Sequence, residues 1–169
     1  MPTLFPDETK SIIEALLFVS DEPLSLKTMA EIIDCPQYDL KILLNEIKAD
    51  CERERKGFCL QEVAGGYFFT TRPEYAPYIE KLVKPRLNTL TQAALETLAI
   101  IAYQQPVTKG KIDQLRGVNS DSALNTLLNR DLIAEVGREE APGRPILYGT
   151  TASFLKYMGL KDLQELPKL

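Results

Sequence analysis

An internal repeat is the sequence feature that most constrains how this chain can fold. A turn proline, a capping hydroxyl and two apolar positions recur 83 residues apart: Pro23, Ser25, Met29 and Ile32 against Pro106, Thr108, Ile112 and Leu115. Three leucines recur 84 residues apart: Leu40, Leu43 and Leu44 against Leu124, Leu127 and Leu128. Chance apolar spacing is a poor explanation for a turn, a helix cap and a helical face that return in the same order. Two copies are too few for a solenoid, so we expect two similar domains in tandem.

Each copy is predicted to contain three helices, a β-hairpin and a closing helix. The first copy is expected to have helices over 12–19, 25–33 and 40–56, strands over 58–63 and 67–71, and a closing helix over 75–83. The second is expected to have helices over 91–102, 108–117 and 121–130, strands over 133–137 and 145–149, and a closing helix over 151–158. Ser25 and Thr91 are predicted N-caps, and Gly57 is a predicted helix stop. Positions expected to face inward include Val19, Ile32, Leu95 and Leu115.

Helix, helix, helix, hairpin is the element order of a winged-helix domain. The residues 84–88 interrupt both periodicities with proline and polar residues and are therefore predicted to be a connector. We thus expect a mainly α fold with small β wings (α+β), built as two tandem winged-helix domains over residues 1–86 and 87–169.

The charge balance argues against DNA as the main partner of these domains. The chain has 20 basic and 24 acidic residues, and in the segment 37–56, the third helix of the first copy, five acids cancel five bases. Phosphate neutralisation needs several unpaired Lys or Arg side chains, which neither third helix offers. Arg138 with Arg144, at the second wing, remains a candidate for weak contact with the DNA backbone. We expect direct DNA binding to be weak or absent, with a DNA-binding transcriptional regulator as the alternative function.

The residue types required for catalysis are missing. The chain has no histidine, which removes the commonest general base and metal ligand. It has no phosphate-cradling glycine motif, and its three cysteines are too few for a cysteine-only zinc site. We therefore expect no enzyme activity, no cofactor and no metal. The odd cysteine count, the lack of an apolar run of about 20 residues and an N-terminus unlike a signal peptide predict a cytoplasmic protein with no membrane contact.

The hairpin of the first copy carries more aromatic side chains than its own three helices can bury. Consecutive residues of a strand point to opposite faces, so Tyr67, Phe68 and Phe69 cannot all be buried against the same helices. Either a second subunit or the helix over 75–83 could supply the missing cover. The first of these makes the hairpin, with Phe58, Tyr67, Phe68 and Phe69, a candidate dimer interface.

Several stretches resemble the segregation and condensation protein B family. In the second copy these are residues 90–103, 105–108, 116–118, 131–133, 143–151, 154–155 and 159–160, and in the first copy residues 14–18 and 22–25. The run 143–151, Gly-Arg-Pro-Ile-Leu-Tyr-Gly-Thr-Thr, is the most distinctive. The resemblance covers nearly the whole chain, and no motif within it identifies partner-binding residues one by one.

The resemblance implies a subunit of the bacterial chromosome-condensing complex, which contains an SMC ATPase and a kleisin, segregation and condensation protein A. It also implies tandem winged helices, a homodimer formed mainly by the N-terminal domain, kleisin binding by that dimer, and association with the nucleoid. Our candidates for kleisin binding are apolar and aromatic residues of the second copy, each with a place in the core as its alternative: Tyr103, Tyr148, Phe154, Tyr157 and Met158.

Overall fold

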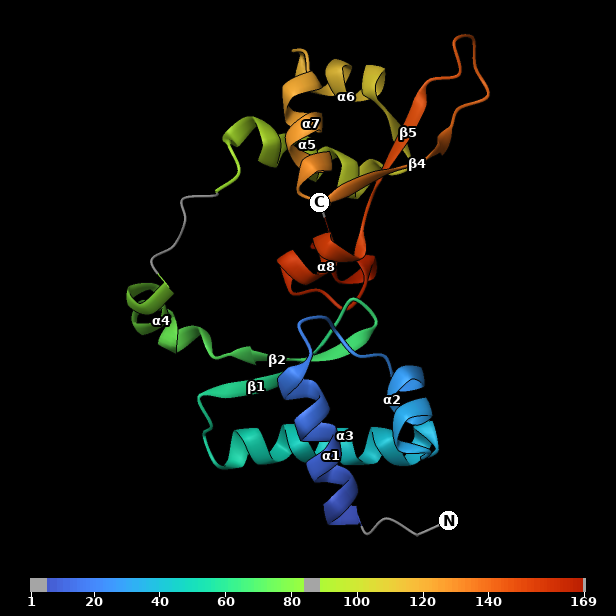
Figure 1. Ribbon diagram of the computed structural model, residues 1–169. Helices are drawn as coiled ribbons and strands as arrows, with labels where there is room; N and C mark the ends of the chain where they lie inside the picture. Colours follow the sequence, from blue (N-terminus) through green and yellow to red (C-terminus); the bar gives the residue numbers. More distant parts are fainter. Residues whose placement is uncertain (1–5, 84–88, 169) are drawn as a thin grey trace. The chain divides into compact units, whose positions relative to one another are not determined.

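The computed structural model describes residues 6–83 and 89–168. The chain divides into two compact units, Met1–Arg86 and Leu87–Leu169, here unit 1 and unit 2. The predicted connector at 84–88 lies outside the described residues. Both units contain helices with a small antiparallel sheet, which confirms the predicted α+β fold class (Figure 1).

Unit 1 consists of three helices, a β-hairpin and a closing helix (Figure 1). Its elements are α1 (Pro6–Val19), α2 (Leu26–Ile33), α3 (Gln37–Arg53), β1 (Phe58–Val63), β2 (Gly66–Thr71), the 3-10 turn η1 (Pro73–Tyr75) and α4 (Ala76–Val83). Ser25 caps α2 as predicted, because its hydroxyl accepts a hydrogen bond from the Thr28 N–H. α3 ends earlier than expected, at Arg53, and Gly57 is not its stop signal. Arg55, with a φ of 50°, already lies outside the helix.

The core of unit 1 lies between its three helices and one face of the hairpin. Its buried residues are Ile13, Leu17, Met29, Ile33, Leu40, Leu43, Leu44, Ile47, Cys51, Leu60 and Tyr67. Burial raises the pKa of the Cys51 thiol, which is 1% exposed. The helical spacing of these residues on α1, α2 and α3 explains why the three helices pack on one another.

The hairpin of unit 1 depends on a tight turn and on one close backbone contact. Ala64 and Gly65 have φ values of 48° and 72°, and a two-residue type I′ turn requires positive φ at both positions. Tyr67 of β2 exchanges two backbone hydrogen bonds, of 2.9 and 2.8 Å, with Leu24. A Cβ on Gly66 would lie 2.9 Å from the backbone of the segment before α2, so this approach requires glycine.

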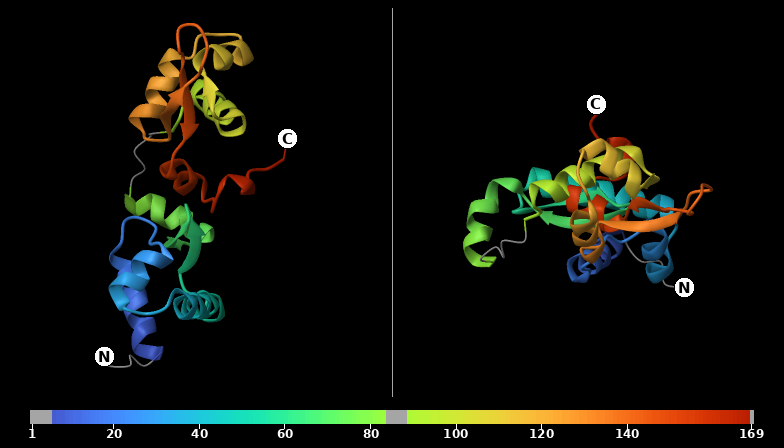
Figure 2. Two further views of the ribbon diagram at one scale, coloured as in Figure 1. Left: turned by 90° about the vertical axis from the view of Figure 1, so that its right-hand side faces the viewer. Right: turned by 90° about the horizontal axis from the view of Figure 1, so that it is seen from above.

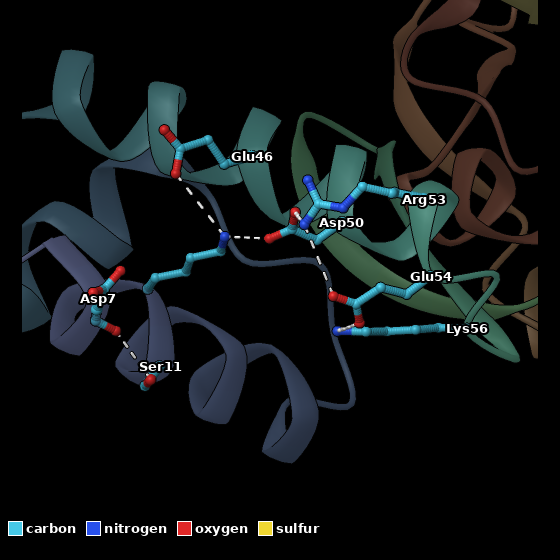
Figure 3. Close-up of polar contacts among 8 residues, drawn as sticks. Asp7, Ser11, Glu46, Asp50, Arg53, Glu54 and Lys56 are labelled. Atoms are coloured by element: carbon cyan, nitrogen blue, oxygen red, sulfur yellow. Dashed lines mark hydrogen bonds and ion pairs between the residues drawn. The ribbon is translucent and has the colours of Figure 1, made fainter.

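A polar cluster joins the outer parts of α1 and α3 (Figure 3). The Lys10 ammonium of α1 donates a hydrogen bond to the Asp50 carboxylate of α3, which also pairs with Arg53. The hydrogen bond from Lys10 lowers the pKa of Asp50, and Arg53 adds to this effect. The cluster therefore fixes α1 against α3 beyond the edge of the apolar core.

Unit 2 repeats the plan of unit 1 with a larger sheet (Figures 1 and 2). Its elements are α5 (Gln92–Gln104), β3 (Val107–Thr108), α6 (Lys109–Arg116), α7 (Asp121–Asn129), β4 (Ile133–Arg138), β5 (Ile146–Thr150), α8 (Ala152–Met158) and the 3-10 turn η2 (Leu163–Glu165). Thr91 caps α5 as predicted, and the strands lie in the order β3-β5-β4. The short strand β3 was not predicted, because two residues after a turn carry no alternation.

The two units can be aligned residue by residue along their first helices. Residues 85 apart are buried in both: Thr9, Ile13 and Leu17 of α1, and Ala94, Leu98 and Ala102 of α5. On this alignment Phe18 corresponds to Tyr103. The backbone bridge between Leu24 and Tyr67 likewise corresponds to the pairing of Val107 with Tyr148.

Four helix positions that were expected to face inward are exposed: Val19, Ile32, Leu95 and Leu115. Val19 is the last residue of α1, where the helix has already passed the core. In α2, Met29 and Ile33 lie four residues apart and occupy the core-facing side, so Ile32 is left on the flank. Leu115, at the equivalent position of α6, is exposed in the same way.

Candidate protein-interaction surfaces

An apolar groove of about 580 Å³ lies between the end of α1 and the hairpin of unit 1. The residues that line it include Leu17, Phe18, Phe58, Phe69, Glu14 and Lys56. Phe18 is 87% exposed although it is large and apolar. Exposed apolar surface of this kind is typical of protein-interaction sites.

The aromatic side chains of the groove are packed against one another. The rings of Phe58 and Phe69 meet edge to face, with centroids 5.0 Å apart and an interplanar angle of 72°. The Lys56 ammonium lies 5.9 Å from the Phe58 ring centre. A hydrogen bond to Glu54 raises the pKa of this lysine, which therefore stays charged at the rim of the groove. The groove thus has an ordered apolar floor with a charged edge.

The structure places the four candidate dimer residues differently. Phe58 and Phe69 line the groove, and Phe58 is exposed while Phe69 is half-buried. Tyr67 is buried in the core, where its backbone pairs with Leu24, so its side chain is not available to a partner. Phe68 is half-buried and also lines the groove.

Helix α4 does not cover the groove of its own unit. None of the residues 76–83 is buried, and the described residues that line the groove do not include any of α4. Tyr78 and Leu82, four residues apart on one side of the helix, are 71% and 84% exposed. Figure 1 shows α4 set apart from the three helices of unit 1. Among the described residues, α4 therefore does not provide the cover for the hairpin that was one of the two sequence-based alternatives.

The corresponding segment of unit 2 does pack on its own unit. Phe154 of α8 is 2% exposed and belongs to the core, and Leu155 and Leu166 pack against that core. The Tyr103 hydroxyl, at the position equivalent to Phe18, donates a hydrogen bond of 2.8 Å to the Pro167 carbonyl oxygen. Unit 2 thus covers with its own residues a region that unit 1 leaves open.

Two of the five candidates for kleisin binding are core residues, which corrects the prediction. Phe154 and Tyr148 are buried, and burial raises the pKa of the Tyr148 hydroxyl. A partner could reach neither side chain without opening the core. Tyr103 is half-buried beneath the C-terminal segment, whereas Tyr157 and Met158 on α8 are exposed and remain candidates.

Arg53 of α3 and Arg138 of the second wing each have a partner within the chain. Arg53 pairs with Asp50 and Glu54. Arg138 donates a hydrogen bond to the carbonyl oxygen of Arg144, so the two candidates for DNA contact lie together at the wing.

In the described part of the chain, no group of three or more His, Cys, Asp or Glu side chains could hold a metal ion.

The exposed positions Phe18, Leu82 and Tyr78 were not predicted as interaction residues. Phe18 follows the buried Leu17 directly and so falls outside the apolar stripe of α1, a signal that the sequence carried. The exposure of Tyr78 and Leu82 could not be predicted from the sequence, because an amphipathic pattern predicts an apolar face of a helix but not what covers it.

Across residues 6–83 and 89–168, no helix is long and apolar enough to cross a membrane.

Comparisons with known proteins find similarity to one family over most of the chain. The family model described as "Segregation and condensation complex subunit ScpB" matches residues 11–169. A segregation and condensation protein B from Symbiobacterium thermophilum is 55% identical over 158 residues, 94% of this chain and 72% of the relative. The crystal structure of ScpB from Mycobacterium tuberculosis is 39% identical, with a TM-score of 0.46, over 93% of this chain and 98% of that one. A crystallised dimer of the ScpB N-terminal domain complexed with ScpA peptide is 39% identical, with a TM-score of 0.43, over 45% of this chain and 95% of that one.

Proposed function

Because the chain belongs to the ScpB family of segregation and condensation complex subunits, we propose that it is a non-enzymatic accessory subunit of the bacterial SMC–kleisin complex. Unit 1 forms a homodimer, and the dimer binds the central segment of the kleisin ScpA through unit 2. The SMC ATPase is reached through the kleisin. The subunit acts in the cytoplasm, associated with the nucleoid, and supports chromosome condensation and segregation during cell division.

The family match over residues 11–169 is the observation that carries this proposal. The surface chemistry supports it, because unit 1 exposes Phe18 and Leu82 and unit 2 exposes Tyr157 and Met158. Exposed apolar side chains can bind an amphipathic helix of a partner, with a few large side chains contributing most of the affinity. In this role the subunit stiffens a flexible kleisin and so sets the geometry of the ATPase ring.

The test is the mass of the complex formed by the full chain with ScpA. Light scattering after size exclusion is expected to show a dimer of this chain, and a complex that contains ScpA when the two are coexpressed. Tyr157→Glu with Met158→Glu should weaken ScpA binding about 10-fold or more, since each change places a charge in an apolar contact. Val136→Glu, at another exposed apolar position of unit 2, is the matched control. A chain that stays monomeric and does not bind ScpA would contradict the proposal.

Salt dependence separates this function from that of a transcriptional regulator. Binding to duplex DNA weakens steeply with salt because phosphate contacts release counterions. Apolar capture of a kleisin helix depends much less on salt. Tight binding to one DNA sequence, with a steep salt slope, would favour the regulator.

A further inference from the structure

Helix α4 exposes apolar side chains that the described part of its own unit does not cover. Helices in proteins are stabilised mainly by packing of an apolar face, and no residue of α4 is buried. It carries Tyr78, Leu82 and Val83 exposed, so its apolar side is not buried against the described part of unit 1. Something must cover this side for the helix to persist.

The apolar groove of unit 1 offers a complementary surface. The groove volume of about 580 Å³ exceeds the combined volume of a tyrosine and a leucine side chain. Its lining includes one acid, Glu14, and one base, Lys56, while the polar side of α4 carries Glu80 and Lys81. Charges of both signs on both surfaces allow opposite charges to meet at the rim.

Unit 2 shows where the segment after the wing belongs in this fold. The Thr151 N–H, just before α8, donates a hydrogen bond to the Leu132 carbonyl oxygen. In unit 1 the Arg72 N–H, just before η1 and α4, donates to the Gly57 carbonyl oxygen in the same way. The two segments leave their hairpins equivalently, but only α8 among the described closing helices has a residue in the core of its unit.

We propose that two copies of this chain exchange their α4 helices, so that Tyr78 and Leu82 of each copy occupy the groove beside Phe18 and Phe58 of the other. This inference rests on the homodimer of the proposed function and names how it is made. The exchange is reciprocal: each copy gives one helix and receives one, as a two-fold symmetric interface requires. Both unpartnered apolar surfaces of unit 1 are buried in a single step.

The experiment is sedimentation equilibrium of the full chain carrying substitutions on either side of the contact. The groove variant is Phe18→Glu, and the helix variant combines Tyr78→Glu with Leu82→Glu. Each should raise the dimer dissociation constant about 100-fold or more, because a charge replaces a central apolar contact on both sides of the symmetric interface. The matched control is Tyr38→Glu on α3, which is 76% exposed and lies outside the groove and α4, and should change the constant less than about 3-fold.

Mixing the two variants distinguishes exchange from other arrangements. A heterodimer of the groove variant and the helix variant regains one intact contact, from the unmodified α4 into the unmodified groove. The mixture should therefore dimerise at least about 10-fold more tightly than either variant alone. Failure of the mixture to recover would overturn the exchange.

The unmodified chain gives an independent test that does not depend on how the variants fold. Hydrogen exchange in residues 76–83 should slow as the chain concentration rises through the dimer dissociation constant. Exchange in α4 that is independent of concentration would overturn the proposal. A dimer that neither variant weakens would overturn the exchange and leave the homodimer standing, whereas an unmodified chain that stays monomeric contradicts the homodimer itself.

Discussion

Unit 1 and unit 2 follow one plan but differ in what their closing segments do. In unit 2, α8 places Phe154 in the core, and the Tyr103 hydroxyl holds the backbone of Pro167. In unit 1, the equivalent of Tyr103 is the exposed Phe18, and α4 has no buried residue. The same fold therefore yields one domain whose closing helix contributes to its core and one whose closing helix stays exposed.

The sheet of unit 2 is also more extensive than that of unit 1. Unit 2 has a third strand, β3, with two residue pairs to β5. Unit 1 has a single bridge, between Leu24 and Tyr67, in place of that strand. Unit 1 thus depends more strongly on one close backbone contact.

The largest expected effect separates the two closing helices. Phe154→Ala should lower the free energy of unfolding of unit 2 by about 3–5 kcal/mol, because it opens a cavity in a packed core. Leu82→Ala, at dilutions where the chain is monomeric, should change that of unit 1 by less than about 0.5 kcal/mol, as for an exposed side chain. Urea unfolding of the full chain with peptide-level hydrogen exchange measures both. Similar costs for the two substitutions would remove the contrast between α8 and α4.

The next largest loss of stability is expected at the backbone bridge between Leu24 and Tyr67 in unit 1. Gly66→Ala should destabilise unit 1 by about 1–3 kcal/mol, because the new Cβ would lie 2.9 Å from the Pro23 carbonyl carbon and force the backbones apart. Gly110→Ala on α6 is the control, since its Cβ meets nothing within 4 Å. Thermal unfolding should show a loss for the first variant and no loss for the second. An unchanged melting temperature for Gly66→Ala would show that this contact can relax freely.

A smaller effect concerns the C-terminal segment of unit 2. Tyr103→Phe removes the hydrogen bond to the Pro167 carbonyl oxygen and should cost about 0.5–1.5 kcal/mol. Faster hydrogen exchange over residues 163–168, with the rest of unit 2 unchanged, would be the signature. If exchange there is unaltered, the apolar contact of Leu166 holds the segment by itself.

The smallest effect is electrostatic and is matched in the two units. Lys10 lowers the pKa of Asp50 in unit 1, and Lys109 lowers that of Asp113 in unit 2. A carboxyl whose folded-state pKa is lowered stabilises the fold above its unfolded pKa of about 3.9 and loses this contribution as pH falls through the folded value. Lys10→Met should therefore raise the pKa of Asp50 alone, and Lys109→Met that of Asp113 alone. Carboxyl NMR titration measures both, and a shift of both groups in one variant would contradict the assignment.

The fold was largely predictable from the sequence because the repeat places caps, turns and apolar faces twice. Ser25 and Thr91 cap their helices, and the strands of both hairpins lie within about one residue of their expected bounds. The exposed flanks were less predictable: Ile32 and Leu115 sit beside the buried stripe, where periodicity does not decide between core and surface.

The interaction surfaces were predictable in part. The hairpin aromatics indicated that part of the hairpin needs to be covered, and Phe58, Phe68 and Phe69 do line the open groove. The buried positions of Tyr148 and Phe154 could not be separated from surface aromatics, because apolar residues look alike in sequence whether they meet a core or a partner. What covers the groove is a tertiary property, which the spacing of apolar residues along the chain does not specify.

All three cysteines lie in unit 1, and Cys51 of α3 belongs to the buried core of this unit. A thiol that is 1% exposed, with a pKa raised by burial, can react with an alkylating reagent only when its surroundings open. The rate at which Cys51 is labelled therefore reports how often the core of unit 1 opens. Cys35 and Cys59 are only half-buried, so labelling must be read peptide by peptide to separate Cys51 from them, and unit 2 adds no thiol of its own.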